Sequence, residues 1–470
     1  MVVPLNRQEL MDLAKNVTGK LLLRQEIPLS AFHFTQAVEQ KFIRAVPSFT
    51  KKHFTLQCNR CGNNEKRLMA QYPCSICNKT HSYCRKCIAM GRVSECTMLY
   101  EWSGPVPEWK IHADPCTWKG TLTEAQQKAA DRIASAVVNK EKELLSWAVC
   151  GAGKTEMLFP AITIALKQGK RICLATPRAD VVRELQPRIQ QAFSDVTVQA
   201  LYGGSKDKKG TAQLILATTH QLLRFKQAFD VMIIDEIDAF PFHAEPSLSF
   251  AAERAIKLDS TTIYLTATPR KQQLKRIRNN LLPHIFVPRR FHSYPLPVPQ
   301  MKQVSQLKSQ LKKKELPPSF LKWLLIRKHP QRQILVFVPT VSLADHLSVP
   351  LTDLLISYDI ITSKQQASTV HASDGDREEK VQSFRDRDLF MLLTTTILER
   401  GVTFPSVDVI ILDAGHHVFD QAAIVQIAGR AGRSTDDPFG DVLLFHDGKT
   451  EAMVEAVESI RKMNKRGGFA

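Results

Sequence analysis

Residues 148–156 read A-V-C-G-A-G-K-T-E and combine the residue types that grip a chain of phosphates. Small residues let consecutive backbone N–H groups close around phosphate oxygens. Lys154 supplies a point charge for the terminal phosphates, and the Thr155 hydroxyl can ligate Mg²⁺. We therefore predict that this loop binds ATP with Mg²⁺ and that the chain hydrolyses the nucleotide. The loop residues with a predicted nucleotide role are Gly151, Ala152, Gly153, Lys154, Thr155 and Glu156.

A carboxylate pair follows the apolar run at residues 231–234, where a phosphate loop needs a partner for its metal ion. In D-E-I-D, Asp235 is suited to orient Mg²⁺ through water, and Glu236 is suited to polarise the attacking water. A buried strand that ends in a solvated acidic turn would have the same pattern. Thr266 and Thr268 follow another apolar run, and their hydroxyls can relay between the nucleotide and the carboxylates.

Two arginines, Arg430 and Arg433, are spaced by three in Q-I-A-G-R-A-G-R, which places them on one face of a helix or helix end. A planar guanidinium stabilises charge on a transferring phosphate, so these residues are suited to complete a composite ATP site. Two arginines alone would also fit an ordinary solvated helix. The order along the chain, with phosphate loop, acids, threonines and arginines in succession, favours the catalytic interpretation.

The elements that must position these residues form an α/β pattern. Strands of four to six apolar residues alternate with helical stretches in both halves of the chain, which predicts two doubly wound parallel sheets. The proline-rich stretch 294–299 is expected to be the hinge between them. We predict four parts, namely an accessory segment at 1–57, a zinc module at 58–118, an ATP-binding domain at 119–298 and a C-terminal domain at 299–470.

Six of the ten cysteines form three CxxC pairs ahead of the motor halves. Paired CxxC turns supply the four thiolates of a structural Zn²⁺ site, and a site of this kind leaves no position open for catalysis. One ion needs only four ligands, so the outer pairs or the first two pairs can supply them, and His81 is a further candidate. The extra pair leaves open a second ligand arrangement or a redox-active dithiol. We expect the remaining cysteines to be structural, namely Cys96, Cys116, Cys150 and Cys173.

The charge balance indicates a polyanionic partner. The net charge is +18 and the sequence pI is about 9.5, which suits nucleic acid or an anionic membrane surface. No stretch approaches the roughly 20 apolar residues that a membrane span needs, and the amino terminus has no apolar signal core. We therefore expect a cytoplasmic protein that reaches the inner face of the membrane only through partners or charge.

Taken together, the motifs resemble those of superfamily 2 helicases, whose phosphate loop also begins with alanine, and within them the ComFA family of late-competence DNA-uptake ATPases. The resemblance covers residues 119–450 and includes L-T-E-A-Q at 122–126, which implies that Gln126 contacts the adenine base. The sequence D-E-I-D-A-F-P at 235–241 points to ComFA in particular. The fold implied is two RecA-like domains behind the zinc module.

The resemblance also implies residue roles and partners. The zinc ligands that it implies are the outer pairs Cys58, Cys61, Cys84 and Cys87. The residues that resemble strand-gripping motifs are Thr176, Pro177, Arg178, Thr218, Thr219, His220, Thr340, Thr394 and Thr395. Hydroxyls at strand ends can hold phosphates without reading bases, although Thr218 and Thr219 would serve equally as helix caps. Phe240 and Phe242 are candidates for base stacking, with burial in the core as the commoner fate of phenylalanine.

The function implied is that of an ATP-dependent translocase or helicase that draws single-stranded transforming DNA into the cytoplasm. ComFC, DprA and the membrane channel ComEC are the implied partners, and an oligomer is compatible with the pattern. Three alternatives stand beside this interpretation. They are a replication-restart helicase resembling PriA, in which the cysteines interrupt the second motor half, a zinc-dependent DNA-binding scaffold without turnover, and an RNA helicase of similar fold.

Overall fold

The computed structural model describes residues 6–52, 55–75, 77–205 and 209–469. The chain divides into two compact units. One comprises Met1–Trp147 and Thr155–Ile285, and the other comprises Ala148–Lys154 and Phe286–Ala470. Among the described residues, no helix combines the length and the apolar character needed to cross a membrane.

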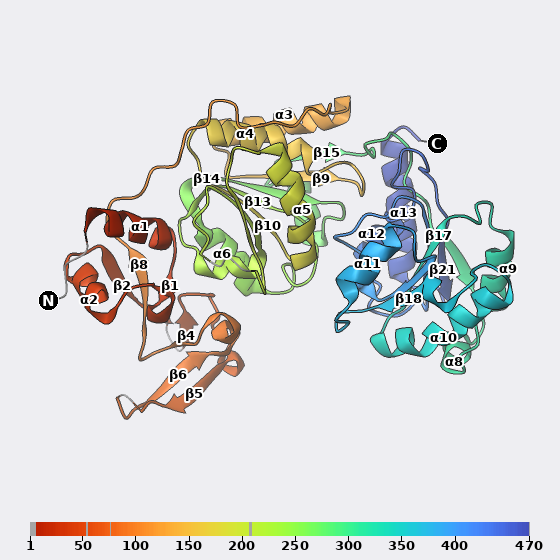
Figure 1. The fold of residues 1–470 in the computed structure, drawn as a ribbon, viewed down its shortest axis with the longest axis horizontal. Coiled ribbons are helices and arrows are strands. Elements are labelled where there is room, and N and C mark those ends of the chain that lie inside the picture. The colour runs from red at the N-terminus through yellow and green to blue at the C-terminus, as the bar shows by residue number, and fades with distance from the viewer. Residues whose placement is uncertain (1–5, 53–54, 76, 206–208, 470) are drawn as a thin grey trace. The chain divides into compact units, whose positions relative to one another are not determined.

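The first unit begins with a small α/β segment (Figure 1). Three short strands pair antiparallel in the order β1-β8-β2, so the chain returns to this sheet after an excursion of about fifty residues. A capping box begins the first helix. The Asn6 side chain accepts a hydrogen bond from the Glu9 backbone N–H, and the Glu9 side chain accepts one from the Asn6 backbone N–H. The elements are α1 (Arg7–Val17), β1 (Leu22–Leu23), η1 (Arg24–Glu26), α2 (Ala31–Glu39), β2 (Ile43–Pro47) and β8 (Met98–Trp102).

The cysteine-rich excursion between β2 and β8 consists of a two-stranded and a three-stranded antiparallel sheet. Cys58 is the last residue of one strand and Cys84 is the last residue of another. The elements are β3 (Phe49–Lys52), β4 (Thr55–Cys58), η2 (Lys66–Leu68), β5 (Met69–Pro73), β6 (Thr80–Cys84), η3 (Arg85–Met90) and β7 (Val93–Ser94).

A seven-stranded sheet in the order β11-β12-β10-β13-β14-β9-β15 forms the centre of the first unit. The pairings from β11 through β9 are all parallel, as the alternation of strands and helices predicts. Its strands are β9 (Glu143–Ala148), β10 (Ile172–Thr176), β11 (Val198–Leu201), β12 (Leu214–Thr218), β13 (Phe229–Ile234), β14 (Ile256–Thr266) and β15 (His284–Val287). The helices around it are α3 (Glu124–Val138), η4 (Glu156–Leu158), α4 (Phe159–Lys167), α5 (Ala179–Ala192), η5 (Thr219–Arg224), α6 (Pro246–Ala255) and α7 (Lys271–Arg278).

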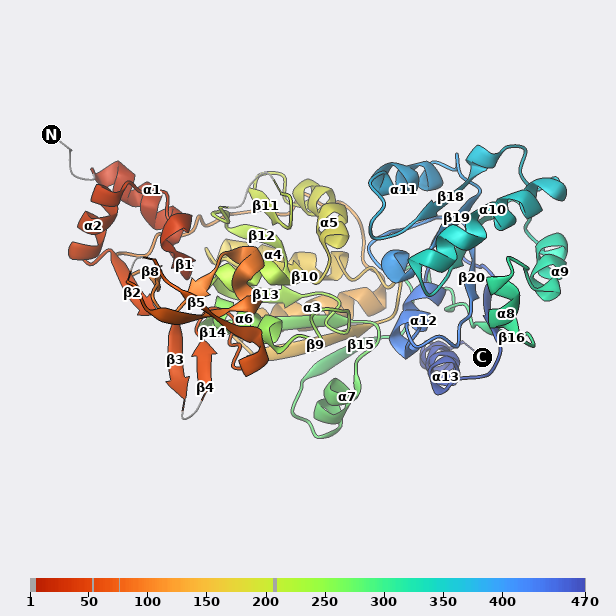
Figure 2. The ribbon, with the colours of Figure 1, turned by 90° about the horizontal axis from the view of Figure 1, so that it is seen from below.

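Alternate residues of β10, which lies in the sheet whose strands are labelled in Figure 2, belong to two separate cores. In β10, Ile172 and Leu174 face a core shared with α3, α4 and α5. Cys173 and Ala175 face the opposite core, which is shared with α6 and with residues of the N-terminal segment such as Leu21 and Cys58. The N-terminal segment and α6 therefore pack on one face of the sheet, and α3, α4 and α5 pack on the other.

The second unit carries a six-stranded, wholly parallel sheet in the order β16-β21-β20-β17-β19-β18. The strands are β16 (Gln300–Gln303), β17 (Gln333–Phe337), β18 (Ala367–Val370), β19 (Met391–Thr394), β20 (Val407–Leu412) and β21 (Val442–His446). The helices are α8 (Leu307–Lys312), α9 (Pro318–Ile326), α10 (Val341–Ser357), η6 (Lys364–Gln366), α11 (Arg377–Arg385), η7 (Thr396–Leu398), α12 (Gln421–Ala428) and α13 (Glu451–Arg466). Both large sheets are thus the parallel α/β sheets that the sequence pattern predicts.

Candidate ATPase site and metal centre

The phosphate loop follows β9 and leads through η4 into α4, which is the predicted order of strand, loop and helix. Gly151 and Gly153 have φ values of 78° and 71°, a left-handed backbone that glycine adopts without steric cost. The Gly151 carbonyl accepts from the Phe291 backbone at 2.9 Å. Lys154 is half-buried, which leaves its ammonium able to reach a bound anion.

Glu156, the last residue of the predicted loop, is engaged by another part of its own unit. Its carboxylate pairs with the Arg188 guanidinium on α5 at 2.5 Å. This ion pair ties the start of the helix that follows the loop to α5.

The acids follow β13 at the carboxyl end of the sheet. The Asp235 backbone donates to the Ala175 carbonyl of the neighbouring strand at 2.8 Å, and Asp235 Oδ1 accepts from the Glu236 backbone at 2.8 Å. Glu236 has a left-handed backbone with φ 53°, which is uncommon for a residue with a side chain and is typical of functional turns. The geometry fits a pair of carboxylates that bind Mg²⁺ and water.

Asp238 connects this turn to residues 266–270 by hydrogen bonds, a role that the sequence motif alone did not indicate. Its side chain is 1% exposed and accepts from Thr266 Oγ1 at 2.5 Å and from Thr268 Oγ1 at 2.7 Å. Its carbonyl accepts two bonds from the Arg270 guanidinium. The two threonines expected to relay between the nucleotide and the carboxylates are thus hydrogen-bonded to the acidic turn. They lie 28 and 30 positions after Asp238 in the chain.

We expect Asp238→Ala to lower stability and to uncouple ATP turnover from movement along a strand. The change leaves two buried hydroxyls without their acceptor, at a cost of about 1–3 kcal/mol each. Thermal unfolding, ATP hydrolysis and displacement of a third strand from a triplex would be measured. Asp259→Ala, at a side chain that is 85% exposed, is the matched control. If Asp238→Ala displaced as much third strand per ATP hydrolysed as this control, the proposed role of Asp238 would be contradicted.

Gln126, the predicted adenine contact, lies in the first turn of α3. Its side chain accepts from the Thr123 backbone at 2.8 Å while Thr123 Oγ1 accepts from the Gln126 backbone at 3.4 Å, which makes a capping box. The amide is thereby held in one orientation. Contact with a base stays a prediction.

The residues of the first unit that are predicted to grip a nucleic-acid strand cluster at the ends of two paired β-strands. Thr176 ends β10 and lies opposite Thr218, which ends β12. The hydroxyls of Thr176 and Thr219 are buried, and neither has a hydrogen-bond partner among the described residues. Such groups carry a desolvation cost that a ligand oxygen would remove. Beside them, Pro177 is buried, and Arg178 and His220 are half-buried.

The threonines of the second unit that are predicted to bind nucleic acid are engaged or buried within the protein. Thr340 caps α10 by accepting from the Leu343 backbone at 3.1 Å. Thr394 Oγ1 donates to the Val370 carbonyl at 2.9 Å, and Thr395 is buried at the start of η7. Thr340 is exposed, so of these three it is the one whose surface a strand can reach directly.

Both predicted arginines lie just beyond the end of α12 and are held by backbone carbonyls. Arg430 is 2% exposed and donates twice to the Glu399 carbonyl, and Arg433 donates to the Gly429 carbonyl at 2.8 Å and to the Val402 carbonyl at 3.2 Å. In the same unit, Cys150 of the phosphate loop lies with its Sγ 3.2 Å from Gln426 Oε1 on α12. The loop predicted to bind phosphate and the helix that precedes the arginines therefore touch.

The outer cysteines converge into one cluster. The four thiols are fully buried, and their sulfur atoms all lie within 4.8 Å of one another. Cys58 and Cys87 Sγ atoms are 3.8 Å apart, and those of Cys61 and Cys84 are 3.5 Å apart. Hydrogen bonds from Cys58 and the other thiols lower the pKa of Cys84, whereas those with Cys58 raise the pKa of Cys61 and Cys87. A divalent cation would remove this competition for protons, so the donor set fits Zn²⁺.

Buried arginines join this cluster to the motor sheet. Arg60, between Cys58 and Cys61, pairs with Glu26 at 2.9 Å and donates to the Leu223 carbonyl. From α6, Arg254 donates to the carbonyls of Asn59 and Arg60, and burial lowers its pKa to about 10. The sequence did not single out Arg254, because its partners lie almost 200 residues earlier in the chain.

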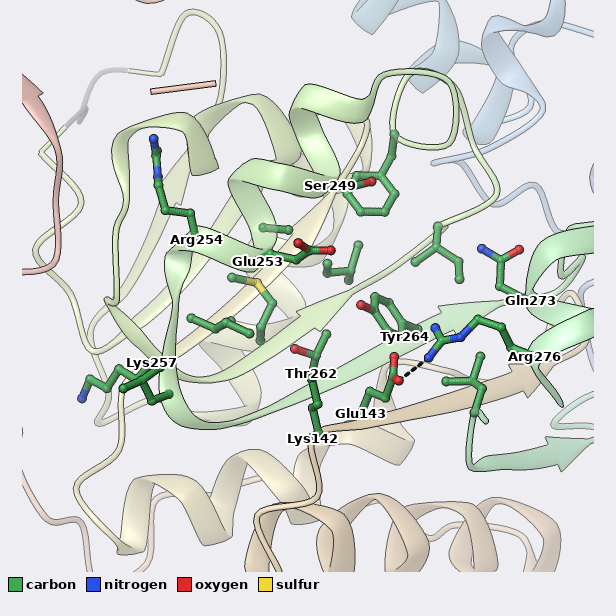
Figure 3. A pocket seen from close by; sticks show the side chains of 18 of the residues that line it. Lys142, Glu143, Ser249, Glu253, Arg254, Lys257, Thr262, Tyr264, Gln273 and Arg276 are labelled. Carbon is green, nitrogen blue, oxygen red and sulfur yellow. Dashed lines mark hydrogen bonds and ion pairs between the residues drawn. The ribbon is translucent and has the colours of Figure 1, made fainter. Parts of the chain in front are cut away.

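A pocket of about 940 Å³ lies on the same sheet face, between α6 and α7 (Figure 3). Glu143 and Arg276 form an ion pair in it, and burial followed by the charges of Glu143 and Glu253 raises the pKa of Tyr264 to about 12. None of the residues predicted to bind ATP or zinc lines this pocket, and of the two candidates for base stacking Phe242 lines it. It is therefore distinct from the ATPase residues.

Comparison with known proteins agrees with the geometry. Residues 6–101 match the competence protein ComFA N-terminal domain, residues 119–271 match the type III restriction enzyme res subunit, and residues 317–435 match the helicase conserved C-terminal domain. The fold resembles the DEAD-box helicase Mss116 bound to ssRNA and UDP-BeF, with a TM-score of 0.54 and 15% identity over 74% of this chain and 83% of that one. It also resembles Mycobacterium smegmatis helicase Lhr bound to ssDNA and AMP-PNP, with a TM-score of 0.53 and 18% identity over 76% of this chain and 51% of that one.

Two parallel α/β sheets that carry a phosphate loop, an acidic pair and an arginine pair define an ATPase of helicase superfamily 2, a class that binds nucleic acid. The chain is 43% identical over 455 residues to competence protein ComFA of Bacillus subtilis (strain 168), covering 97% of this chain and 95% of that protein. It is 37% identical over 432 residues to competence protein ComFA of Streptococcus pneumoniae (strain ATCC BAA-255 / R6), covering 92% and 95%. The chain belongs to the ComFA family, and the predicted family and RecA-like fold are confirmed.

Proposed function

We propose that this protein is an ATP-dependent translocase of single-stranded DNA that draws transforming DNA into the cell during natural competence. The observation that carries the proposal is the position of Thr176 beside Asp235. Thr176 ends β10, and the Asp235 backbone bonds to the residue just before it, Ala175. A change at the nucleotide would therefore reach a strand-gripping hydroxyl across a single strand pairing.

Hydrolysis is assigned to the residues around the phosphate loop. Lys154 holds the terminal phosphates, Thr155 and Asp235 are the groups that would hold Mg²⁺, and Glu236 accepts a proton from the attacking water. Bound Mg²⁺ supplies positive charge against the phosphate oxygens. Arg430 and Arg433 contribute guanidinium charge to the transferring phosphate, and the contact of Cys150 with Gln426 supports a link between loop and arginines.

The strand is held through its phosphates and without base reading. Thr176 and Thr219 offer buried hydroxyls that have no hydrogen-bond partner among the described residues, and Arg178 adds charge beside them. Phe240 is 70% exposed whereas Phe242 is 8% exposed, so the two candidates for base stacking differ in their access to a base. Phe240 is the one that a base can stack on, and Phe242 belongs to the core.

Family membership supports a proposal about the partners and the place of action. We infer that the DNA enters through the membrane channel ComEC and that ComFC and DprA act with this protein on the inner face of the membrane. The net charge of +18 supports attachment to anionic partners. Zn²⁺ bound by the outer cysteines has a structural role, since four thiolates leave no site for a substrate.

The test is ATP hydrolysis by the full chain, alone and with single-stranded DNA, duplex DNA or single-stranded RNA of equal length. We expect single-stranded DNA to stimulate turnover at least tenfold and more than either other polymer. Stronger stimulation by RNA would replace the proposal with an RNA helicase. Tight DNA binding without stimulation would replace it with a scaffold.

A further inference from the structure

The middle CxxC pair, Cys74 and Cys77, takes no part in the cluster of outer cysteines. It lies in the turn between β5 and β6, at the Thr80 end of β6, whereas Cys84 is at the other end of that strand. Cys74 is buried and Cys77 is exposed. Because β6 separates the two groups of thiols, a single ion cannot hold both.

The backbone of the middle pair repeats the turn of the first pair. In the first turn, the Gly62 backbone donates to the Cys58 carbonyl at 2.8 Å, and the Cys58 backbone donates to the Asn63 carbonyl at 2.9 Å. In the middle turn, Asn78 donates to the Cys74 carbonyl at 2.9 Å, and Cys74 donates to the Lys79 carbonyl at 2.9 Å.

The residue after each second cysteine also has the same conformation. Gly62 and Asn78 have left-handed φ values of 72° and 53°, and asparagine is the residue that replaces glycine there at least cost. A turn that already presents two thiols to a metal in one place is therefore built a second time within twenty residues.

Two further donors lie beside the middle turn. Cys96, just beyond β7, has its Sγ 3.8 Å from that of Cys74. Two thiolates on one tetrahedral Zn²⁺, each about 2.3 Å from the ion, are roughly 3.8 Å apart, and Cys58 and Cys87 have the same separation of 3.8 Å. His81 on β6 has its Nε2 2.9 Å from Cys77 Sγ. The four side chains thus form two close pairs, Cys74 with Cys96 and Cys77 with His81, and one CxxC turn contributes a thiol to each pair.

We propose that Cys74, Cys77, His81 and Cys96 bind a second Zn²⁺ ion, with three thiolates and one imidazole as ligands. The ion takes the place of the protons that the thiols now share among themselves and with His81. It joins the β5–β6 turn to the segment after β7, so that the hairpin is held by one metal at each end. A small module with few apolar residues gains stability from such links.

Metal content of the full chain, purified without chelator under anaerobic conditions, tests the proposal. We expect two zinc ions for each chain, and one for Cys96→Ser. Cys116→Ser, at a half-buried cysteine outside both clusters, is the matched control and keeps two. His81→Cys offers a fourth thiolate and also keeps two, which separates loss of a ligand from loss of the fold.

A second measurement uses the unaltered protein. With zinc bound, Cys74, Cys77 and Cys96 are expected to resist alkylation and to become reactive when a chelator is added, as followed by mass spectrometry of peptides. One zinc for each chain, together with immediate alkylation of these three cysteines, would overturn the proposal. So would a mass lower by two hydrogens on a peptide pair that joins Cys74 and Cys96, since that marks a disulfide in place of a metal site.

Discussion

Lys154→Ala is expected to lower ATP turnover by on the order of 10²–10³ or more while single-stranded DNA binding stays nearly unchanged. Removing one fixed charge or donor from a phosphoryl or acyl transition state costs about this much in rate. DNA binding is expected to persist because the strand-gripping residues, such as Thr176 and Thr219, belong to other strand ends. Hydrolysis rate and DNA affinity are measured on the same preparation.

Lys167→Ala is the matched control for this experiment, because Lys167 is an exposed lysine in the last turn of the helix that follows the loop. It removes the same charge from the same region and is expected to hydrolyse ATP at the unaltered rate. Full turnover by Lys154→Ala would show that the loop does not hold the phosphates. Equal loss in both variants would point to general destabilisation.

Replacing Cys58 and Cys61 together with serine is expected to release one zinc ion from each chain and to loosen the N-terminal segment. Structural Zn²⁺ in small domains contributes about 10–16 kcal/mol of apparent binding free energy. Without the metal, four buried side chains lose their common partner, and the carbonyls of Asn59 and Arg60 lose their fixed position against Arg254. We expect the unfolding temperature to fall by on the order of 10 °C.

Zinc analysis, thermal unfolding and limited proteolysis measure this effect. Cleavage is expected to increase within residues 55–102, because that stretch joins the cluster to β8 of the first sheet. Cys116→Ser is again the control and should leave zinc content, unfolding and cleavage unchanged. Unaltered zinc content in the double variant would mean that other residues hold the metal.

The sequence was sufficient for features whose signal is local. The phosphate loop, the acids after an apolar run and the arginines of Q-I-A-G-R-A-G-R are short motifs, and each is read within a few residues. Runs of four to six apolar residues that alternate with helical stretches likewise predicted two parallel sheets, because a strand buried on both faces is apolar throughout. The CxxC spacing narrowed the metal ligands but left two sets of cysteines open.

Local sequence patterns did not predict contacts between residues that are distant in the chain. Asp238 was visible only as the last letter of D-E-I-D, since its partner Thr266 ends the next strand of the sheet and its partner Thr268 follows that strand. Cys96 was expected to be structural because it has no cysteine at ligand spacing. Strand pairing of β6 with both β5 and β7 is what places it near Cys74.

The sequence by itself therefore determined the class of protein and predicted the order of its parts and the residues that bind ATP, because these depend on residue type and short spacing. Only the tertiary structure decided which cysteines converge, that the N-terminal segment packs with α6 on one face of the motor sheet, and which buried arginines join the cysteine cluster to this unit. The physical reason is that convergence depends on strand order and register. In this chain β13 lies between β14, which is the next strand along the chain, and β10, from which β11 and β12 separate it in the sequence.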